Sequence, residues 1–120
     1  MTDRLPIDLR WDAELALANL DDCLEDLKDL LEIFLRQTPR LLRDIRSALE
    51  NNDAQKLHIA SHTLRGSLQI LCADAAESLA GALETAGQQG RIADGTQLLP
   101  KLEEELAVIT QQVQTYLATH

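Results

Sequence analysis

Apolar residues recur every three or four positions along four long stretches of the chain. This spacing places them on one side of an α-helix, and no stretch of comparable length alternates apolar and polar residues as a half-exposed strand would. The pattern predicts helices over about 24–51, 53–72, 74–88 and 98–118, preceded by a short helix over about 12–20. Helices joined by short loops favour an all-α fold, an antiparallel four-helix bundle with a short additional N-terminal helix.

The apolar stripes of these helices define the predicted core. In the short helix, three leucines can cover one end of the bundle, namely Leu15, Leu17 and Leu20. In the four long helices, the stripes consist of Leu24, Leu27, Leu31, Phe34, Leu41, Ile45 and Leu49, then Leu57, Ala60, Leu64, Ile70 and Leu71, then Ala76, Leu79, Leu83 and Ala86, and finally Leu99, Leu102, Leu106, Ile109, Val113 and Leu117.

Turn-forming and capping residues separate the predicted helices. Pro39 lacks a backbone donor and predicts a kink near Gln37. The run at 51–53, Asn-Asn-Asp, predicts a turn and an N-cap for the next helix. Asp74 and Glu77 resemble a capping box at the start of the helix after that.

Glycine and proline set the predicted start of the last helix. Gly87, Gly90 and Gly95 are residues that end helices and turn chains, so they predict a loop. Pro100 is best tolerated in a first helical turn, which places the start of the helix near Leu98.

Composition limits the classes of function. The 120 residues, 45% of them hydrophobic and 26% charged, suit a single domain over 1–120 with a buried core. A net charge of −9 and only three aromatic residues argue against nucleic acid, because nothing neutralises phosphates or stacks on bases. No apolar run is long enough for membrane insertion, and residues 1–6 lack the apolar core of a signal peptide. We therefore expect a cytoplasmic protein.

The third long helix carries the candidate chemistry. At about 100° per residue, His58, His62, Arg65 and Gln69 fall within one narrow arc, opposite the apolar stripe. The imidazole of His62 is therefore expected to face water.

Charge sets the same helix apart. None of the 20 acidic residues lies within 54–73, where about three would be expected at random, and Lys56 with Arg65 gives this stretch a formal charge of +2. The surroundings of His62 are thus predicted to be neutral to basic in an acidic protein.

These residue types suit phosphoryl transfer. A neutral imidazole is a competent nucleophile near pH 7, and a phosphorylated ring nitrogen passes its phosphoryl group on. Arg65, one turn from His62, can neutralise phosphoryl oxygens. Gly66 costs a helix about 0.5–1 kcal/mol relative to alanine, which two alternatives explain. It leaves clearance at a docking surface, or it packs closely against a neighbouring helix.

Two other residue pairs have simpler explanations. Cys23 and Cys72 lie 49 positions apart in apolar helical patterns and are predicted to be buried thiols, neither bridged nor bound to metal. His58 and His62 have the i, i+4 spacing of helical metal ligands, but the sequence between them lacks the glutamate of the zinc protease motif. No third ligand is evident, so no metal site is predicted.

The hexapeptide His-Thr-Leu-Arg-Gly-Ser at 62–67 resembles the phosphoacceptor signature of the histidine phosphotransfer (HPt) family, usually His-Thr-Leu-Lys-Gly-Ser. The stretch 71–73, Leu-Cys-Ala, is similar to the Leu-Gly-Ala that commonly follows, and Leu83-Glu84 matches the family's next helix. The resemblance covers about 24–117, although only the hexapeptide is specific.

The resemblance implies roles for individual residues. His62 would be phosphorylated on the ring nitrogen distal to the backbone, Arg65 stands in place of the usual lysine, and Gly66 matches the family's glycine. Glu84 would accept a hydrogen bond from the proximal ring N–H and orient the imidazole, its alternative being a solvated glutamate.

Residues beside the signature are less specific. Gln69 shares the face of His62 and is either a partner contact or a solvated amide, and His58 either borders the docking surface or is solvated. Arginine at 65 keeps the charge but has a bulkier, planar head, which bears on partner preference or rate. Cys72 in place of glycine suggests a different helix end.

We therefore interpret the chain as a phosphorelay intermediate and not an enzyme. His62 would take a phosphoryl group from a receiver-domain aspartyl phosphate and give it to another receiver; the receivers would bring the Mg²⁺, and the chain would bind no cofactor. Response-regulator receivers and a sensor or hybrid histidine kinase are the expected partners of a monomer. The alternatives are a phosphoacceptor domain of a chemotaxis-type kinase and a non-catalytic helical interaction module, in which exchanging His62 or Arg65 would be harmless.

Overall fold

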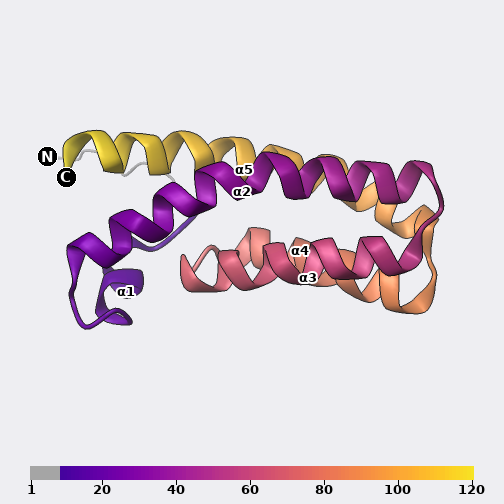
Figure 1. Ribbon diagram of the computed structural model, residues 1–120, viewed down its shortest axis with the longest axis horizontal. Coiled ribbons are helices and arrows are strands. Elements are labelled where there is room, and N and C mark those ends of the chain that lie inside the picture. The colour runs from indigo at the N-terminus through magenta and orange to yellow at the C-terminus, as the bar shows by residue number, and fades with distance from the viewer. Residues whose placement is uncertain (1–8) are drawn as a thin grey trace, which may run out of the picture.

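The computed structural model describes residues 9–120, which form five α-helices. Helices α2 to α5 run alternately up and down, and α1 lies beside one end of the α3–α4 pair (Figure 1). The predicted all-α fold, an antiparallel four-helix bundle with a short N-terminal helix, is confirmed. The helices are α1 (Ala13–Ala18), α2 (Leu24–Glu50), α3 (Ala54–Ile70), α4 (Asp74–Gln89) and α5 (Ile92–Thr119).

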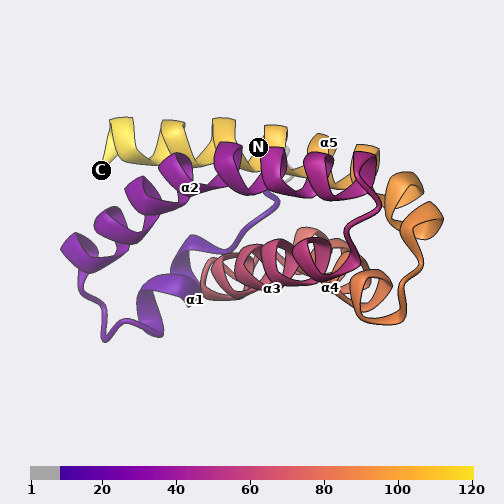
Figure 2. The same ribbon diagram turned by 45° about the vertical axis from the view of Figure 1, so that its right-hand side comes forward.

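The bundle consists of a long pair and a short pair of helices. α2 and α5, of 27 and 28 residues, run side by side and extend beyond α3 and α4, of 17 and 16 residues (Figures 1 and 2). The segment before α1 joins the two pairs, because Trp11 is buried with its ring edge on Tyr116 of α5 and the backbone N–H of Asp12 donates to the carbonyl of Leu71 after α3.

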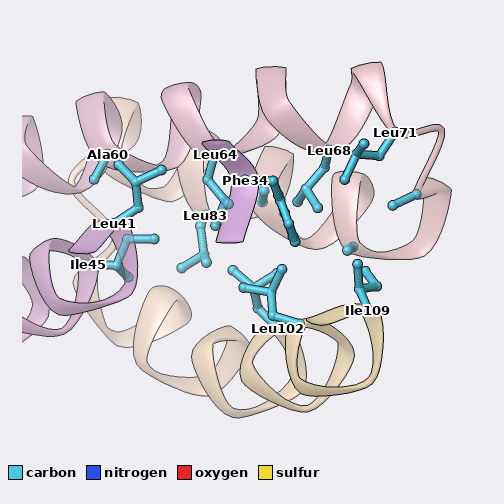
Figure 3. Close-up of a cluster of buried hydrophobic side chains, with 14 of the residues drawn as sticks. Phe34, Leu41, Ile45, Ala60, Leu64, Leu68, Leu71, Leu83, Leu102 and Ile109 are labelled. Atoms are coloured by element: carbon cyan, nitrogen blue, oxygen red, sulfur yellow. The ribbon is translucent and has the colours of Figure 1, made fainter. Parts of the chain in front are cut away.

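Large aliphatic side chains from α2, α3, α4 and α5 meet between the two pairs (Figure 3). Most residues of the predicted stripes are buried, and two are exposed. Ile70 is 46% exposed because it lies at the edge of its stripe, over a groove that Leu30 and Ile33 of α2 also line. Leu15 is 50% exposed, since Ala16 is the residue of α1 that faces the core. Six further stripe residues are only partly buried, namely Leu17, Leu20, Leu24, Leu49, Leu79 and Leu117.

Helix α2 continues through Pro39 and changes direction part-way along, as both ribbon views show. Proline removes one i→i−4 hydrogen bond, and its ring crowds the preceding turn. The hydroxyl of Thr38 donates to the Phe34 carbonyl at 2.7 Å, a bond that favours bending. The structure thus agrees with a kink near Gln37.

The turns on either side of α3 differ in how they are capped. Asp53 is the N-cap of α3, and its side chain accepts from the backbone N–H of Lys56 at 3.0 Å, as predicted. The capping box predicted for α4 is wrong, because Ala73 occupies the N-cap position and Asp74 is already the first helical residue, with Glu77 one turn further on. Residue 73 also closes the end of α3 and so leaves no separate capping position.

The predicted start of the last helix is also wrong. α5 begins at Ile92, so Gly95 and Pro100 both lie inside it. Gly95 is buried, and a Cβ there would lie 2.9 Å from Leu49 Cδ2 and 3.3 Å from Leu57 Cδ2, so the glycine allows close packing on α2 and α3. The first turns of α5 are set at an angle to the rest, as expected where proline interrupts a helix (Figure 2).

The cysteines occupy helix ends. Both are free thiols and only partly buried, contrary to the prediction of two buried side chains. Cys23 is the N-cap of α2, and Cys72 follows Leu71, the C-cap of α3, with φ 56°. Burial raises the pKa of the Cys72 thiol, and nearby Asp12, Asp74 and Glu77 raise that pKa further, so the thiol stays protonated near neutral pH.

None of the helices within 9–120 is long and apolar enough to cross a membrane. The N-terminal residues 1–6, on which the signal-peptide argument rests, lie outside the described part of the chain.

Candidate functional site

Two neighbouring helices bring three of the predicted site residues together. His62 and Arg65 lie one turn apart on α3, and Glu84 lies opposite them on α4. His62 Nδ1 is 2.8 Å from Glu84 Oε2, and Arg65 Nε is 2.8 Å from Glu84 Oε1. One carboxylate therefore contacts both side chains, with one oxygen for each.

Exposure differs sharply among the three side chains. The side chain of His62 is 62% exposed and that of Arg65 40%, whereas Glu84 is 12% exposed. The Glu84 carboxylate is thus mostly buried, while the His62 and Arg65 side chains that it contacts face solvent. The imidazole faces water, as the helical periodicity predicts.

The contact with Glu84 fixes the roles of the two ring nitrogens. A carboxylate beside Nδ1 favours the tautomer with the proton on Nδ1, and the Nε2 lone pair is then directed away from α4. Nε2 is the nitrogen distal to the backbone. The ring is therefore oriented as a nucleophile that attacks through Nε2.

Gly87 explains how α4 comes close enough for this contact. A Cβ at position 87 would lie 2.6 Å from the backbone N of His58 and 2.9 Å from the carbonyl oxygen of Ala54. Only glycine allows the two backbones to touch, one turn after Glu84. The sequence pattern predicted a helix-ending glycine here. The signal for a close helix contact was the position of Gly87 three residues after Glu84 on the same helix.

Gly81 lies on the other side of Glu84. A Cβ there would be 3.4 Å from Cδ of Arg65, so the aliphatic stem of Arg65 lies over this glycine. The sequence pattern predicts no role for Gly81 and no pairing of Arg65 with Glu84. Both follow from the approach of α4 to α3, which no local pattern shows.

The surroundings of Gly66 decide between clearance at a surface and close packing against a neighbouring helix. It is exposed, and a Cβ added to it would meet nothing within 4 Å. Close packing against a neighbouring helix is therefore wrong for Gly66, and an open surface remains.

Two flanking residues of α3 occupy different positions. Gln69 is exposed on the same side of the helix as His62. His58 is half-buried at the contact with α4, where its Nδ1 is 3.5 Å from the backbone carbonyl oxygen of Glu84. His58 therefore belongs to the helix contact as well as to the surface.

A comparison with protein families matches residues 29–112, more than two thirds of the chain, to the Hpt domain. The chain belongs to the Hpt domain family. The resemblance of the hexapeptide to this family is thereby confirmed.

A solved structure similar to this Hpt domain is that of histidine-containing phosphotransfer protein B (HptB) from Pseudomonas aeruginosa PAO1. The two chains are 19% identical and superpose with a TM-score of 0.86, over 95% of this chain and 99% of HptB. At this identity the likeness shows the shared fold. The comparison with curated proteins gives no match.

Membership of the family defines the general activity. An Hpt domain is a phosphotransfer domain, a phosphoryl carrier rather than a catalyst, and Hpt domains relay phosphoryl groups with receiver domains. Within 9–120, no three histidine, cysteine or acidic side chains come together as metal ligands would. The rings of His58 and His62 are 6.2 Å apart between centroids.

Proposed function

We propose that this Hpt domain is a phosphorelay intermediate whose phosphoacceptor is His62. It accepts a phosphoryl group from an aspartyl phosphate on one receiver domain and passes the group to an aspartate of another. The observation that carries this proposal is the imidazole itself, 62% exposed and held through Nδ1 by a carboxylate 2.8 Å away.

The first transfer is a single displacement at phosphorus. The Nε2 lone pair of His62 attacks in line, a P–N bond forms, and the P–O bond to the aspartate breaks, so that the carboxylate leaves with its electron pair. The ring becomes positively charged with its proton on Nδ1. Glu84, in contact with that nitrogen, stabilises the charge and keeps the ring in place.

Arg65 has two tasks in this proposal. Its Nε is 2.8 Å from Glu84 Oε1, and its side chain, which ends in two further nitrogens, is 40% exposed. These terminal nitrogens can reach the phosphoryl oxygens while Nε keeps Glu84 beside His62. A lysine, with one nitrogen, could do only one of the two, so arginine at this position joins orientation to charge neutralisation.

The receiver partners supply what the Hpt domain does not. Receiver active sites hold Mg²⁺ on carboxylates, and that ion neutralises the transferring group. An acid-free α3 suits such a partner, because carboxylates would otherwise face carboxylates. Gly66 and Gln69 are exposed where the receiver would dock, and His58 borders that surface. A sensor or hybrid kinase would feed the relay through the first receiver.

The test is transfer of radiolabelled phosphoryl from a phosphorylated receiver domain. Wild type is expected to acquire a label that is stable in base and labile in acid, as phosphohistidine is. His62→Gln should acquire none. His120→Gln, which removes an exposed histidine at the end of α5, should label as wild type does. An unlabelled wild type, or equal label on His62→Gln, would contradict the proposal.

A further inference from the structure

The positive charge of this acidic protein is concentrated in two stretches that contain no acidic residue. Residues 33–43 of α2 contain Arg36, Arg40 and Arg43, and residues 54–73 contain Lys56 and Arg65. Together they hold five of the 11 basic residues and none of the 20 acidic ones, so their formal charge is +5 and the other 89 residues carry −14.

The two stretches lie side by side, because α2 and α3 are antiparallel neighbours (Figure 1). Arg40 lines a groove together with Lys56, Ile59 and Thr63 of α3, and Asp44 and Asp53 line the same groove. Thr63 is the residue next to His62. Further along, Ile33 and Ile70 line a second groove between the same helices. Arg36 lies on α2 between Ile33 and Arg40.

The three arginines of α2 form one exposed stripe. At 3.6 residues per turn they fall within an arc of about 60°, and all three are exposed. Within 9–120 none of them forms an ion pair, whereas Arg46 pairs with Glu103, Arg91 with Asp94 and Arg10 with Glu105. Their charge is therefore available to a partner. Arg40 is the member beside α3, and Arg43 lines the groove between α2 and α5 with Glu103. We call Arg36, Arg40 and Arg43 the arginine stripe.

We propose that the arginine stripe is a docking surface for the acidic active-site face of a receiver domain. This inference rests on the proposed function of His62 and extends the contact beyond α3. The 89 residues outside the two stretches carry a formal charge of −14 and repel the acidic face of a receiver. The unpaired arginines of α2 offset this repulsion near His62. A receiver over His62 would then meet Arg65 of α3 and Arg40 of α2.

The experiment compares charge reversals on and off the stripe. Arg40→Glu, and the triple reversal Arg36→Glu, Arg40→Glu and Arg43→Glu, are compared with Lys101→Glu, which makes the same charge change at an exposed site on α5. The second-order rate of phosphoryl transfer is measured with the receiver that serves wild type fastest. Labelling by phosphoramidate, a small donor that needs no docking surface, reports whether His62 remains reactive.

At low salt we expect Arg40→Glu to lower the transfer rate about 10-fold and the triple variant to lower it further, within the range of electrostatic steering. The differences should disappear near about 1 M salt, where the Debye length falls to about 3 Å. Lys101→Glu should transfer nearly as wild type does, and phosphoramidate should label all variants equally.

Three results would overturn the inference while leaving His62 as phosphoacceptor: unchanged rates in the stripe variants, an equal loss in Lys101→Glu, or a loss that persists at high salt. Binding of wild type, and not of the triple variant, to anionic phospholipid vesicles with no effect on transfer would assign the stripe to a membrane instead. If wild type accepts phosphoryl from phosphoramidate but from no receiver, the proposed function fails, and the inference fails with it.

Discussion

The two sides of α3 are built in opposite ways. Toward α4, Gly87 brings the helix backbones into contact, and the Glu84 carboxylate is held between His62 and Arg65. Away from α4, Gly66 leaves an open surface with nothing within 4 Å of an added Cβ. Gly87 allows close approach on one side, and Gly66 leaves clearance on the other.

This difference separates two requirements of a phosphoryl carrier. The ring must be oriented to within a fraction of an ångström, which a close helix contact and a mostly buried carboxylate provide. The partner must also reach the ring, which requires an uncrowded surface. Helix α3 meets both requirements because successive residues of a helix point in different directions.

The largest expected effect comes from removing the anchor on the closed side. Glu84→Ala leaves the Nδ1 proton of His62 and the Nε of Arg65 without their partner. By analogy with other residues that orient a reactive imidazole, transfer should slow roughly 10- to 100-fold. Glu84→Gln, which keeps an acceptor oxygen but not the charge, should lose less. Single-turnover transfer rates measure both, and equal rates in wild type and Glu84→Ala would show that the carboxylate has no part in orientation.

The second effect tests closeness itself. Gly87→Ala places a methyl group 2.6 Å from the His58 backbone nitrogen and forces α3 and α4 apart. We expect a net loss of about 1–2 kcal/mol in the free energy of unfolding, after a partial offset from alanine's better helix propensity. Urea unfolding measures it. Gly81→Ala, whose methyl group would meet only the flexible stem of Arg65 at 3.4 Å, is the matched control and should not be destabilised.

The third effect fills the open side. Gly66→Ala adds a methyl group where there is free space and improves helix propensity, so the free energy of unfolding should rise by about 0.5–1 kcal/mol. Transfer from a receiver should nevertheless slow, because the methyl group occupies the docking surface. Labelling by phosphoramidate should be unchanged. A variant that is more stable and equally fast with receivers would show that clearance at Gly66 is not needed.

The smallest effect concerns the turn that joins the two sides. Cys72 has a left-handed backbone, φ 56°, which strains a residue with a side chain. Cys72→Gly should relieve this strain and stabilise the fold by a net few tenths to about 1 kcal/mol, because glycine also loses more chain entropy on folding. Cys72→Ala keeps the strain and removes the thiol, so it should not show the gain. Thermal unfolding of the two variants separates backbone from thiol.

The sequence predicted what depends on local pattern. The apolar stripes of the four long stretches predicted the number and order of the long helices. Asp53 was predicted as an N-cap, and the exposure of His62 followed from periodicity. The hexapeptide identified the family. The left-handed turn at Cys72 lies where the resemblance has glycine, the residue that adopts this conformation most easily.

Errors arose where tertiary contacts decide. Gly95 and Pro100 predict a break on local grounds, yet α5 runs through both. Gly95 is explained by packing on Leu49 and Leu57, which needs a small residue there. Gly87 has the same origin, since its neighbour His58 is 29 positions away along the chain. The placement of Glu84 came from the resemblance, and its pairing with Arg65 was not predicted, because the pair spans two helices.

The most direct test of the account is to identify the phosphorylated atom. Wild-type protein labelled with ¹⁵N is phosphorylated by a receiver, and NMR couplings between phosphorus and the ring nitrogens report which nitrogen carries the group. Because Glu84 contacts Nδ1 of His62, the account predicts phosphorylation of His62 at Nε2. Phosphorylation at Nδ1 of His62, or on His58 instead, would contradict it.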